Sequence, residues 1–295
     1  MILLTGATGF IGGHVLRALS EKNIPVRCLV RKPIESENPN ITYMIGDILN
    51  YDSLVKATEG VDTVYYFIHM MGKQREQEKF NVLDRNAITN MVGACKVNGV
   101  TRIIYLTGMS NPKEKLSAHL ASRKEVEEII KNSGINYTIF RASVIIGRGA
   151  AAFEILDTVV RLFLIIPVLS WSNSKVQPIS IGDVVRYLVE CLDKKETINR
   201  CFDIGGLEVF TYKELMKQYS LEIGIIPFFI WIPGTWHWTS SHILGMLAPV
   251  NSELVYRLIE SLKNNMVAEP NDLKQIFGFE PVSFKESIRK IIKSD

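Results

Sequence analysis

The chain has 295 residues, of which 47% are hydrophobic and 22% are charged. This length suits one large or two modest domains, and the composition excludes an intrinsically disordered protein. There are 34 Lys and Arg residues and 31 Asp and Glu residues, a balance that argues against a nucleic-acid-binding protein. The mean hydropathy of +0.11 is high for a soluble enzyme. Part of it comes from residues 223–252, which include no Asp, Glu, Lys or Arg.

Four cysteines are scattered along the chain, without a Cys-x-x-Cys pair or a histidine at metal-ligand spacing: Cys28, Cys95, Cys191 and Cys201. This pattern predicts reduced thiols and no metal site. An apolar strand follows Met1 directly, so we expect no signal peptide and a cytoplasmic protein.

Short apolar runs alternate with helical patterns through the first half of the chain. The predicted strands cover residues 2–4, 25–30, 41–45, 61–68, 102–106 and 137–140, and the predicted helices cover 10–19, 78–97 and 113–131. Strands that are apolar throughout and separated by helices are typical of a parallel sheet covered on both faces. With right-handed crossovers, this pattern predicts an α/β protein with a doubly wound, Rossmann-type sheet.

The second half is less regular. Its predicted elements are an apolar helix over 151–166 stopped by Pro167, a strand over 176–181, a helix over 184–192 with Asp183 as N-cap, a strand over 201–204 and a helix capped by Thr211. No linker separates the halves. We expect a dinucleotide-binding domain over 1–150 and a smaller, mostly helical substrate region over 151–295, from which 176–206 returns to the sheet.

A glycine-rich turn follows the first strand, in the string Thr5-Gly6-Ala7-Thr8-Gly9-Phe10-Ile11-Gly12. Gly6 permits the tight turn, Gly9 lets the backbone approach a pyrophosphate, and Gly12 lets helix and strand pack closely. A strand before it and an amphipathic helix after it are the context that a dinucleotide-binding loop requires. The predicted cofactor contacts are Gly6, Thr8, Gly9, Phe10, Ile11 and Gly12. A purely structural glycine turn is the alternative.

The end of the second strand bears on which cofactor binds. NAD-binding proteins usually carry an acidic residue there, which binds the ribose hydroxyls. Here Val30 is followed by Arg31 and Lys32, with no acid. Two cations suit a 2′-phosphate, which favours NADP(H) over NAD(H). The alternative is a solvated basic turn.

The G-x-x-G-x-x-G spacing of the turn resembles that of extended and atypical short-chain dehydrogenase/reductases. The resemblance implies that an Asp at the end of the third strand contacts the adenine amino group and that the next residue packs on the ring. These two residues are Asp47 and Ile48. Alternatively, Asp47 caps the entry to the following helix.

Residues at the carboxyl ends of later strands are expected to border the nicotinamide, because ligands of open parallel sheets bind at that edge. We predict Ile68, Thr107 and Ser143 as cofactor neighbours. His69, beside them in sequence, is a candidate catalytic residue that acts as a general acid, or else a structural histidine.

Short-chain reductases normally carry the motif Tyr-x-x-x-Lys, in which the lysine lowers the pKa of the tyrosine and holds the ribose. The matching lysine is Lys124, but four residues earlier stands Leu120, which cannot donate a proton. Lys124 is therefore a predicted cofactor ligand and a candidate catalytic residue. It either anchors the ribose or donates a proton, if desolvation lowers its pKa.

Loss of the tyrosine with retention of the lysine resembles NmrA-like and isoflavone-reductase-like atypical short-chain reductases. Further strings, at residues 102–106, 119–126, 140–147, 177–184 and 202–206, resemble bacterial NAD(P)H-binding proteins of the nucleoside-diphosphate-sugar epimerase-like group. The resemblance covers nearly the whole chain and implies a family rather than one reaction. Sugar epimerisation is disfavoured, because its keto-sugar chemistry relies on the missing tyrosine.

These observations predict an NADP(H)-dependent oxidoreductase that reduces a small apolar acceptor, such as a quinone or an activated alkene or carbonyl. The alternative is a non-catalytic NADP(H)-binding sensor or assembly factor, which loss of the tyrosine favours. Prolines and glycines interrupt the uncharged stretch 223–250, which argues against a membrane-spanning helix. This stretch is expected to line an apolar substrate pocket, or to contact a membrane surface or another protein.

Overall fold

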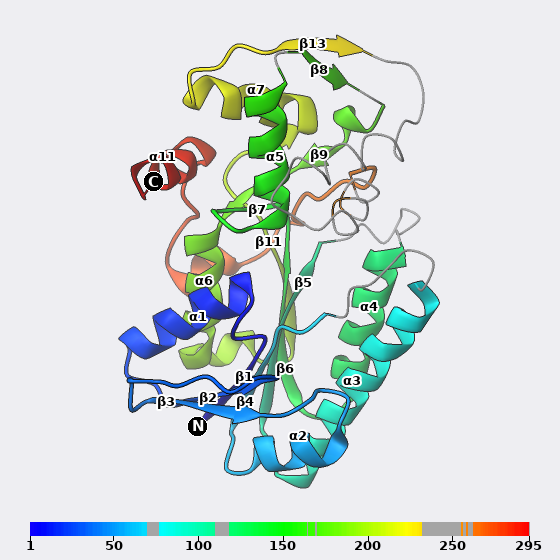
Figure 1. Cartoon of the computed structure of the whole chain (residues 1–295), viewed down its shortest axis with the longest axis vertical. Helices are drawn as coiled ribbons and strands as arrows, with labels where there is room; N and C mark the ends of the chain where they lie inside the picture. The colour runs from blue at the N-terminus through cyan, green and yellow to red at the C-terminus, as the bar shows by residue number, and fades with distance from the viewer. Residues whose placement is uncertain are drawn as a thin grey trace.

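The computed structural model describes residues 1–69, 77–109, 118–163, 165–168, 170–231, 255, 258 and 262–294. Its centre is a parallel sheet of seven strands (Figure 1), in the order β11-β6-β5-β4-β1-β2-β3. The strands are β1 (Ile2–Thr5), β2 (Val26–Val30), β3 (Ile41–Ile45), β4 (Thr63–Tyr66), β5 (Arg102–Gly108), β6 (Asn136–Ala142) and β11 (Arg200–Ile204). The strand order reverses between β1 and β4, which is the switch point of a doubly wound sheet.

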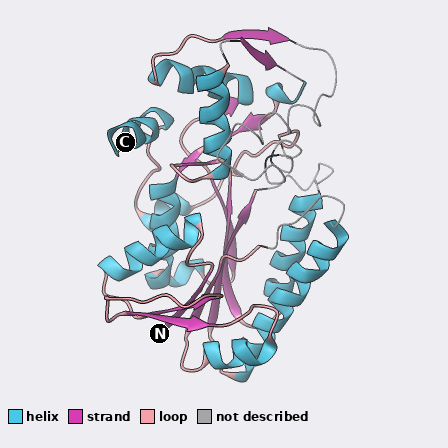
Figure 2. Ribbon diagram, viewed as in Figure 1, coloured by secondary structure: helices cyan, strands magenta, loops and turns pink. Residues whose placement is uncertain are grey.

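Helices cover both faces of this sheet (Figure 2). They are α1 (Phe10–Glu21) and α6 (Ile181–Glu190) on one face, and α2 (Tyr51–Thr58), α3 (Gln77–Val97) and α4 (Ala118–Lys131) on the other. Neighbouring residues of β1 show why the strands are apolar throughout. Leu4 is buried in the core under α1 and α6, and Leu3 in the core under α2, α3 and α4. The predicted Rossmann-type α/β fold is confirmed.

The predicted strands of the first half are present, with small shifts at their ends. The fourth, predicted over 61–68, ends at Tyr66. Beyond it, the Phe67 N–H donates to the Thr5 hydroxyl at 3.1 Å, and that hydroxyl donates to the carbonyl oxygen of Tyr65 at 3.0 Å. A buried side chain therefore ties the ends of β1 and β4 together where the backbone ladder stops.

The second half adds a third hydrophobic core beyond the sheet. Its helices are α5 (Ala151–Leu162), α7 (Tyr212–Glu222) and α11 (Phe284–Ser294), while α10 (Leu273–Phe277) packs on the core under α1 and α6. Its two-stranded sheets pair β7 (Ile145–Ile146) with β10 (Ile179–Ser180), β9 (Lys175–Val176) with β12 (Phe210–Thr211), and β8 (Ile165–Val168) with β13 (Phe228–Trp231). Only β11 from this half of the described chain joins the seven-stranded sheet, at its edge beside β6.

The apolar helix predicted over 151–166 is wrong at its C-terminal end. α5 ends at Leu162, and Pro167 lies within β8 instead of stopping a helix. Within the described residues β8 has one neighbour, β13. A residue without an N–H is tolerated in such an edge strand. A continuous apolar run does not distinguish the end of a helix from a buried strand.

The single strand predicted over 176–181 is also wrong, because Pro178 separates β9 from β10. These two short strands pair with different partners. The turn after β11 packs on this break, since a Cβ at Gly206 would stand 2.1 Å from the carbonyl oxygen of Pro178. Glycine is required there by contact.

Asp183 is not the N-cap of the next helix, as the sequence predicted. α6 begins earlier, at Ile181, and its N-cap is Ser180, whose hydroxyl accepts the Gly182 N–H at 3.0 Å. The Asp183 carboxylate accepts the Val282 N–H at 3.0 Å and so fastens the C-terminal segment to α6. The predicted cap at Thr211 is confirmed, in a capping box that begins α7.

Of the uncharged stretch 223–250, the structure describes residues 223–231, and the last four of these form β13 (Phe228–Trp231). For residues 232–250, the expectation that they line a substrate pocket or contact a membrane surface or another protein lies outside the described residues. No helix in the described part of the chain is long and apolar enough to cross a membrane.

Candidate functional site

The glycine-rich turn connects β1 to α1. Gly6 has a φ of +74°, and its carbonyl oxygen accepts the Gly9 N–H at 2.9 Å. A Cβ at Gly6 would stand 2.8 Å from the carbonyl oxygen of Phe67, just beyond β4. A Cβ at Gly12 would stand 2.1 Å from the carbonyl oxygen of Gly6. Both positions require glycine, Gly6 for its backbone conformation and Gly12 for close contact.

The turn leaves the N-terminus of α1 without a side-chain cap, because its N-cap is Gly9. The first N–H groups of a helix and the positive end of its dipole together fit a pyrophosphate. Thr8 and Gly9 are exposed at this point. The tight turn and the uncapped helix end fit the dinucleotide predicted from the sequence.

Phe10 and Ile11, both predicted as cofactor contacts, use their side chains for packing. The Phe10 ring would lie 3.3 Å from a Cβ at Gly147 and 3.2 Å from one at Gly149. Ile11 packs on the core under α1 and α6. We therefore expect these two residues to contact a cofactor through their backbone N–H groups.

Arg31 and Lys32 follow β2 directly, and both side chains are exposed. Because β2 lies beside β1, the two cations and the glycine-rich turn share one edge of the sheet. No carboxylate within the described residues forms an ion pair with either of them. This placement fits a phosphate group bound next to the turn.

Asp47 closes the turn that leads into α2. One of its carboxylate oxygens accepts the Leu49 N–H at 2.9 Å. The Ser53 hydroxyl accepts the Asp47 N–H at 3.1 Å and donates to the Asp47 carbonyl oxygen at 2.9 Å. The N-cap of α2 is Asn50. Ile48 is only 5% exposed and packs into the core under α2, α3 and α4. Both residues thus have structural contacts of their own.

The ends of β5 and β6 differ in what their hydroxyl groups contact. Thr107 is buried, and its hydroxyl oxygen has no hydrogen-bond partner in the described part of the chain. Such orphaned groups are uncommon, and a ligand would complete this one. The Ser143 hydroxyl is already engaged, since it donates to Met266 O at 2.8 Å and accepts the Gln177 N–H at 3.1 Å. Ile68 packs against the core under α2, α3 and α4.

His69 takes part in a buried polar cluster. Its Nδ1 lies 2.9 Å from a carboxylate oxygen of Asp84 on α3, and the Ser122 hydroxyl on α4 donates to the same oxygen at 3.0 Å. Asp84 and Ser122 are both 3% exposed, and the His69 side chain is 13% exposed. The contact between Nδ1 and Asp84 fixes the orientation of the His69 ring.

Sequence reasoning did not find Asp84 and Ser122. They are 38 residues apart, and the packing of α3 on α4 brings them together. The available signal was a serine within the buried face of a predicted helix.

Leu120 stands where short-chain reductases carry tyrosine. It is 4% exposed, and a Cβ at Gly108, the last residue of β5, would stand 3.4 Å from its Cδ2 atom. Lys124 lies one helical turn later on α4 and is exposed. The structure thus puts an apolar side chain at the end of β5 and leaves the lysine accessible.

A family model described as NAD(P)H-binding matches residues 6–195. The chain belongs to this family. The matched range begins at the glycine-rich turn and ends beyond α6, so it includes every predicted cofactor and catalytic residue. NAD(P)H binding and the predicted family are confirmed.

Curated relatives include reductases and an assembly factor. The ceramide reductase of Caulobacter vibrioides is 26% identical over 239 residues, which cover 79% of this chain and 74% of the relative. The photosystem II assembly factor Ycf39 of Cyanophora paradoxa is 23% identical over 223 residues, which cover 73% of this chain and 66% of the factor. Family membership therefore does not by itself distinguish catalysis from assembly.

The fold is shared with a solved nucleoside-diphosphate-sugar epimerase from Staphylococcus aureus. The two chains are 19% identical and superpose with a TM-score of 0.78, over 98% of this chain and 99% of the epimerase. At this identity the likeness establishes the architecture of the NAD(P)H-binding chain.

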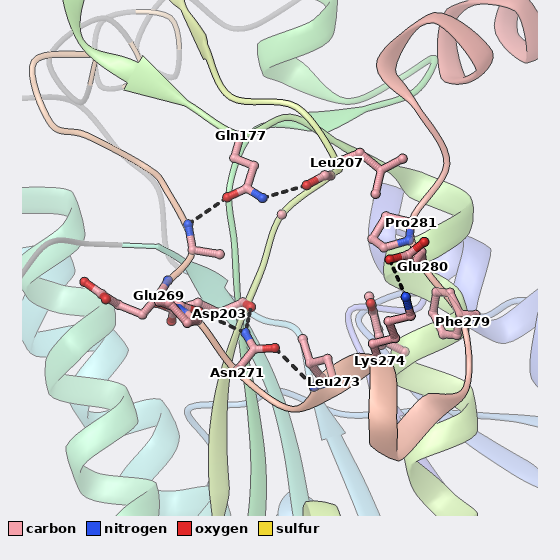
Figure 3. Close-up of a pocket in the computed structure, with 15 residues that line it drawn as sticks. Gln177, Asp203, Leu207, Glu269, Asn271, Leu273, Lys274, Phe279, Glu280 and Pro281 are labelled. Atoms are coloured by element: carbon pink, nitrogen blue, oxygen red, sulfur yellow. Dashed lines mark hydrogen bonds and ion pairs between the residues drawn. The ribbon is translucent and has the colours of Figure 1, made fainter.

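A cavity of about 250 Å³ opens at the carboxyl end of β11 (Figure 3). Its polar side chains already have partners, mostly backbone groups. The Gln177 amide donates to Gly206 O at 2.6 Å and accepts the Ala268 N–H at 2.9 Å, and Lys274 pairs with Glu280 at 2.8 Å. Four steps of the strand order separate β11 from β1, so this cavity is distinct from the glycine-rich turn. The hydrogen bonds around it connect the C-terminal segment to the sheet.

The described residues include no group of three or more His, Cys, Asp or Glu side chains that could hold a metal ion. The four cysteines are free thiols, as predicted.

Proposed function

We propose that this chain is an NADPH-dependent reductase of a small apolar acceptor, a quinone or an activated alkene or carbonyl. The observation that carries the proposal is the buried His69–Asp84 pair at the edge that also holds the glycine-rich turn. Gly6 meets the backbone of Phe67 directly, and His69 is two residues further along. A cofactor loop and an oriented imidazole therefore border one another.

When bound, NADPH supplies a hydride, so the protein must supply a proton and an aligned, water-excluding pocket. Leu120 cannot provide that proton. The Asp84 carboxylate stabilises the imidazolium form of His69, from which Nε2–H donates to the developing oxyanion of the acceptor. Solvent then restores the proton. Lys124 anchors the ribose, and the Thr107 hydroxyl bonds the cofactor or the acceptor oxygen.

An apolar acceptor is supported by kinship and by site chemistry. The relative named ceramide reductase acts on a lipid, as its name states. Leu120 replaces a polar hydroxyl by an apolar side chain at the end of β5. An acceptor that is already electrophilic needs less help from a proton donor than an unactivated ketone does.

The test is NADPH oxidation by the purified protein with a panel of quinones, enones and aldehydes. We expect His69→Ala to lower kcat by about 10²–10⁴-fold while the Kd for NADPH is unchanged. Lys124→Ala should chiefly weaken NADPH binding. Val97→Ala, at an exposed position near the end of α3, is the control and should match the wild type. Tight NADPH binding with no turnover of any acceptor would contradict the proposal.

The preference for NADPH has its own prediction. Replacing Arg31 by Ala should weaken NADPH binding by about 1–3 kcal/mol, because a charge-assisted bond to the 2′-phosphate is lost, and leave NADH binding nearly unchanged. Titration calorimetry with both cofactors measures this difference. Arg17→Ala, an exposed cation on α1, is the matched control. Equal losses for both cofactors would show that Arg31 does not bind the 2′-phosphate.

A second candidate is a non-catalytic NADP(H)-binding sensor or assembly factor. It is favoured by the buried Leu120 at the tyrosine position and by the Ycf39 relative. This function predicts that the protein turns over no acceptor. It also predicts that limited proteolysis gives different fragment patterns for the NADPH-bound and the NADP⁺-bound protein. Identical patterns would remove the sensor role.

A further inference from the structure

Two polar side chains, Asp84 and Ser122, interrupt the apolar interface between α3 and α4. Each is 3% exposed. The residues that follow on the same helix faces are apolar and buried: Ala87, Ile88 and Met91 on α3, and Val126 and Ile130 on α4. The two helices follow β4 and β5, so their first turns lie at the carboxyl edge of the sheet, which also holds the glycine-rich turn.

A buried carboxylate contributes little to stability, because the cost of removing it from water offsets what its contacts return. Apolar residues at both positions would continue the interface without that cost. The contacts of Asp84 indicate another role for the pair. Its Oδ2 atom accepts the Ser122 hydroxyl at 3.0 Å and lies 2.9 Å from Nδ1 of His69. The hydroxyl and the imidazole thus meet at one oxygen atom.

Two phenols also face Asp84, from the sheet. Tyr66 on β4 and Tyr105 on β5 are buried, and their ring centres lie 6.0 Å apart. Burial raises the pKa of each phenol, and the Asp84 carboxylate raises it further. Arg123 and Glu127 on α4 act on the pKa of Tyr105 in opposite directions. Both phenols therefore stay neutral in the pH range where a histidine titrates.

We propose that Ser122 is a positioning residue, whose hydroxyl holds the Asp84 carboxylate in the orientation that contacts His69. The carboxylate of an aspartate rotates broadly about χ2. A second donor on Oδ2 restricts this rotation to the arrangement in which that oxygen faces Nδ1. The inference rests on the proposed role of His69 as proton donor. It makes α4 the support of both parts of the site, since Lys124 lies on the same helix.

NMR of the histidine rings measures the orientation without cofactor or acceptor. The His69 signals are those that His69→Ala removes, and their shifts are followed against pH. We expect Asp84→Asn, which removes the charge beside Nδ1, to lower the pKa of His69 by about one pH unit. Ser122→Ala should lower this pKa by about half a pH unit, because the carboxylate then contacts Nδ1 for only part of the time.

Two further variants separate the hydrogen bond from packing. Ser122→Cys fills the same space but donates only weakly, so the pKa of His69 should fall as it does in Ser122→Ala. The double variant Arg85→Gln, Glu125→Gln removes an exposed ion pair between the same two helices without a change in net charge. It should leave the His69 titration unchanged. Circular dichroism and urea unfolding check that every variant is folded.

The same variants are then assayed with NADPH and the acceptor panel. Ser122→Ala should lower kcat about tenfold and leave the Kd for NADPH unchanged. The proposal is overturned if Ser122→Ala leaves the pKa of His69 unchanged or raises it. It is also overturned if Ser122→Cys behaves as the wild type, which would assign position 122 to packing. A wild type without turnover, in which Ser122→Ala still lowers this pKa, would retain the positioning role and contradict the proposed catalysis alone.

Discussion

Gly12 is the residue of the cofactor loop with the least room. A Cβ there would stand 2.1 Å from the Gly6 carbonyl oxygen, and both contacting groups are backbone. We expect Gly12→Ala to lower the free energy of unfolding by about 1–3 kcal/mol, because helix and turn must separate. The NADPH Kd should rise at least about tenfold. Urea denaturation and fluorescence titration measure the two effects.

Gly13, the next residue, provides the control. A Cβ there would lie 3.6 Å from Ala7 O, an ordinary contact, and the residue is helical. Gly13→Ala should be neutral or stabilise the fold by about 0.5–1 kcal/mol, with NADPH affinity retained. Equal loss in both variants would mean that the turn does not depend on close packing at position 12.

The sequence could predict those parts of the site whose residues lie close together in the chain. Gly6 and Gly12 belong to one turn, so their spacing was sufficient to predict a dinucleotide-binding loop. Asp84 and Ser122 reach His69 from two different helices, and no pattern in a single chain records which helix faces pair. Ser143 shows the converse, because its strand-end position was predicted correctly while the bonds of its hydroxyl to the C-terminal segment were not foreseeable.

At the scale of elements, Asp157 connects two helices of the third core. On α5 it accepts hydrogen bonds from Arg161 at 2.5 Å and Arg148 at 3.1 Å, and from the Tyr219 hydroxyl on α7. Burial alone would raise the pKa of Asp157, but the bonds from Tyr219, Arg161 and Arg148 outweigh it and lower the pKa. The folded protein therefore holds this proton less tightly than the unfolded chain does.

A lowered pKa in the folded state gives a stabilisation that is fully present above the unfolded pKa of about 3.9 and is lost as the pH falls through the folded value. Asp157→Asn should lower the free energy of unfolding by about 1–3 kcal/mol at neutral pH. The difference from the wild type should shrink only below about pH 4. Denaturant unfolding across this pH range measures it.

Asp193, an exposed carboxylate beyond α6, supplies the comparison. Asp193→Asn should change stability little at any of these pH values. A difference between wild type and Asp157→Asn that persisted unchanged into acid would show that shape, rather than charge, explains the loss.

Element boundaries were predictable where a cap or a glycine marks them. Thr211 and Glu214 form a reciprocal cap, so the start of α7 was predicted. The uninterrupted apolar run through Leu162 and Pro167 carries no such mark, and its last part pairs as β8 instead of continuing α5. Its pairing partner, β13, lies some sixty residues later in the sequence, so no local pattern could indicate the pairing.

At the scale of the whole molecule, the reactivity of the cysteine thiols measures how well the fold protects them from solvent. Cys28, Cys95 and Cys191 are buried, and burial raises the pKa of each thiol to about 12. Burial, with the neighbouring Glu127, raises the pKa of Cys201 to about 11. At pH 8 almost no reactive thiolate is present.

We expect a thiol reagent to label none of the four cysteines of the folded protein at pH 8, and all four in denaturant. Mass spectrometry of the labelled protein counts the modified sites. Rapid labelling of a single native thiol would indicate local opening around that residue. NADPH should further slow any slow labelling, because it stabilises the folded state.

A segment that precedes the last helix lies in the same core as the first strand. Phe277 and Phe279 pack around Tyr187 in the cluster that also buries Ile2 and Leu4. A ribosome that has released the glycine-rich turn, β1 and α1 must synthesise nearly the whole chain before these aromatic rings are available. The core under α1 and α6 therefore stays incompletely packed until these rings are synthesised, which leaves apolar surface of the nucleotide-binding half open to aggregation during translation.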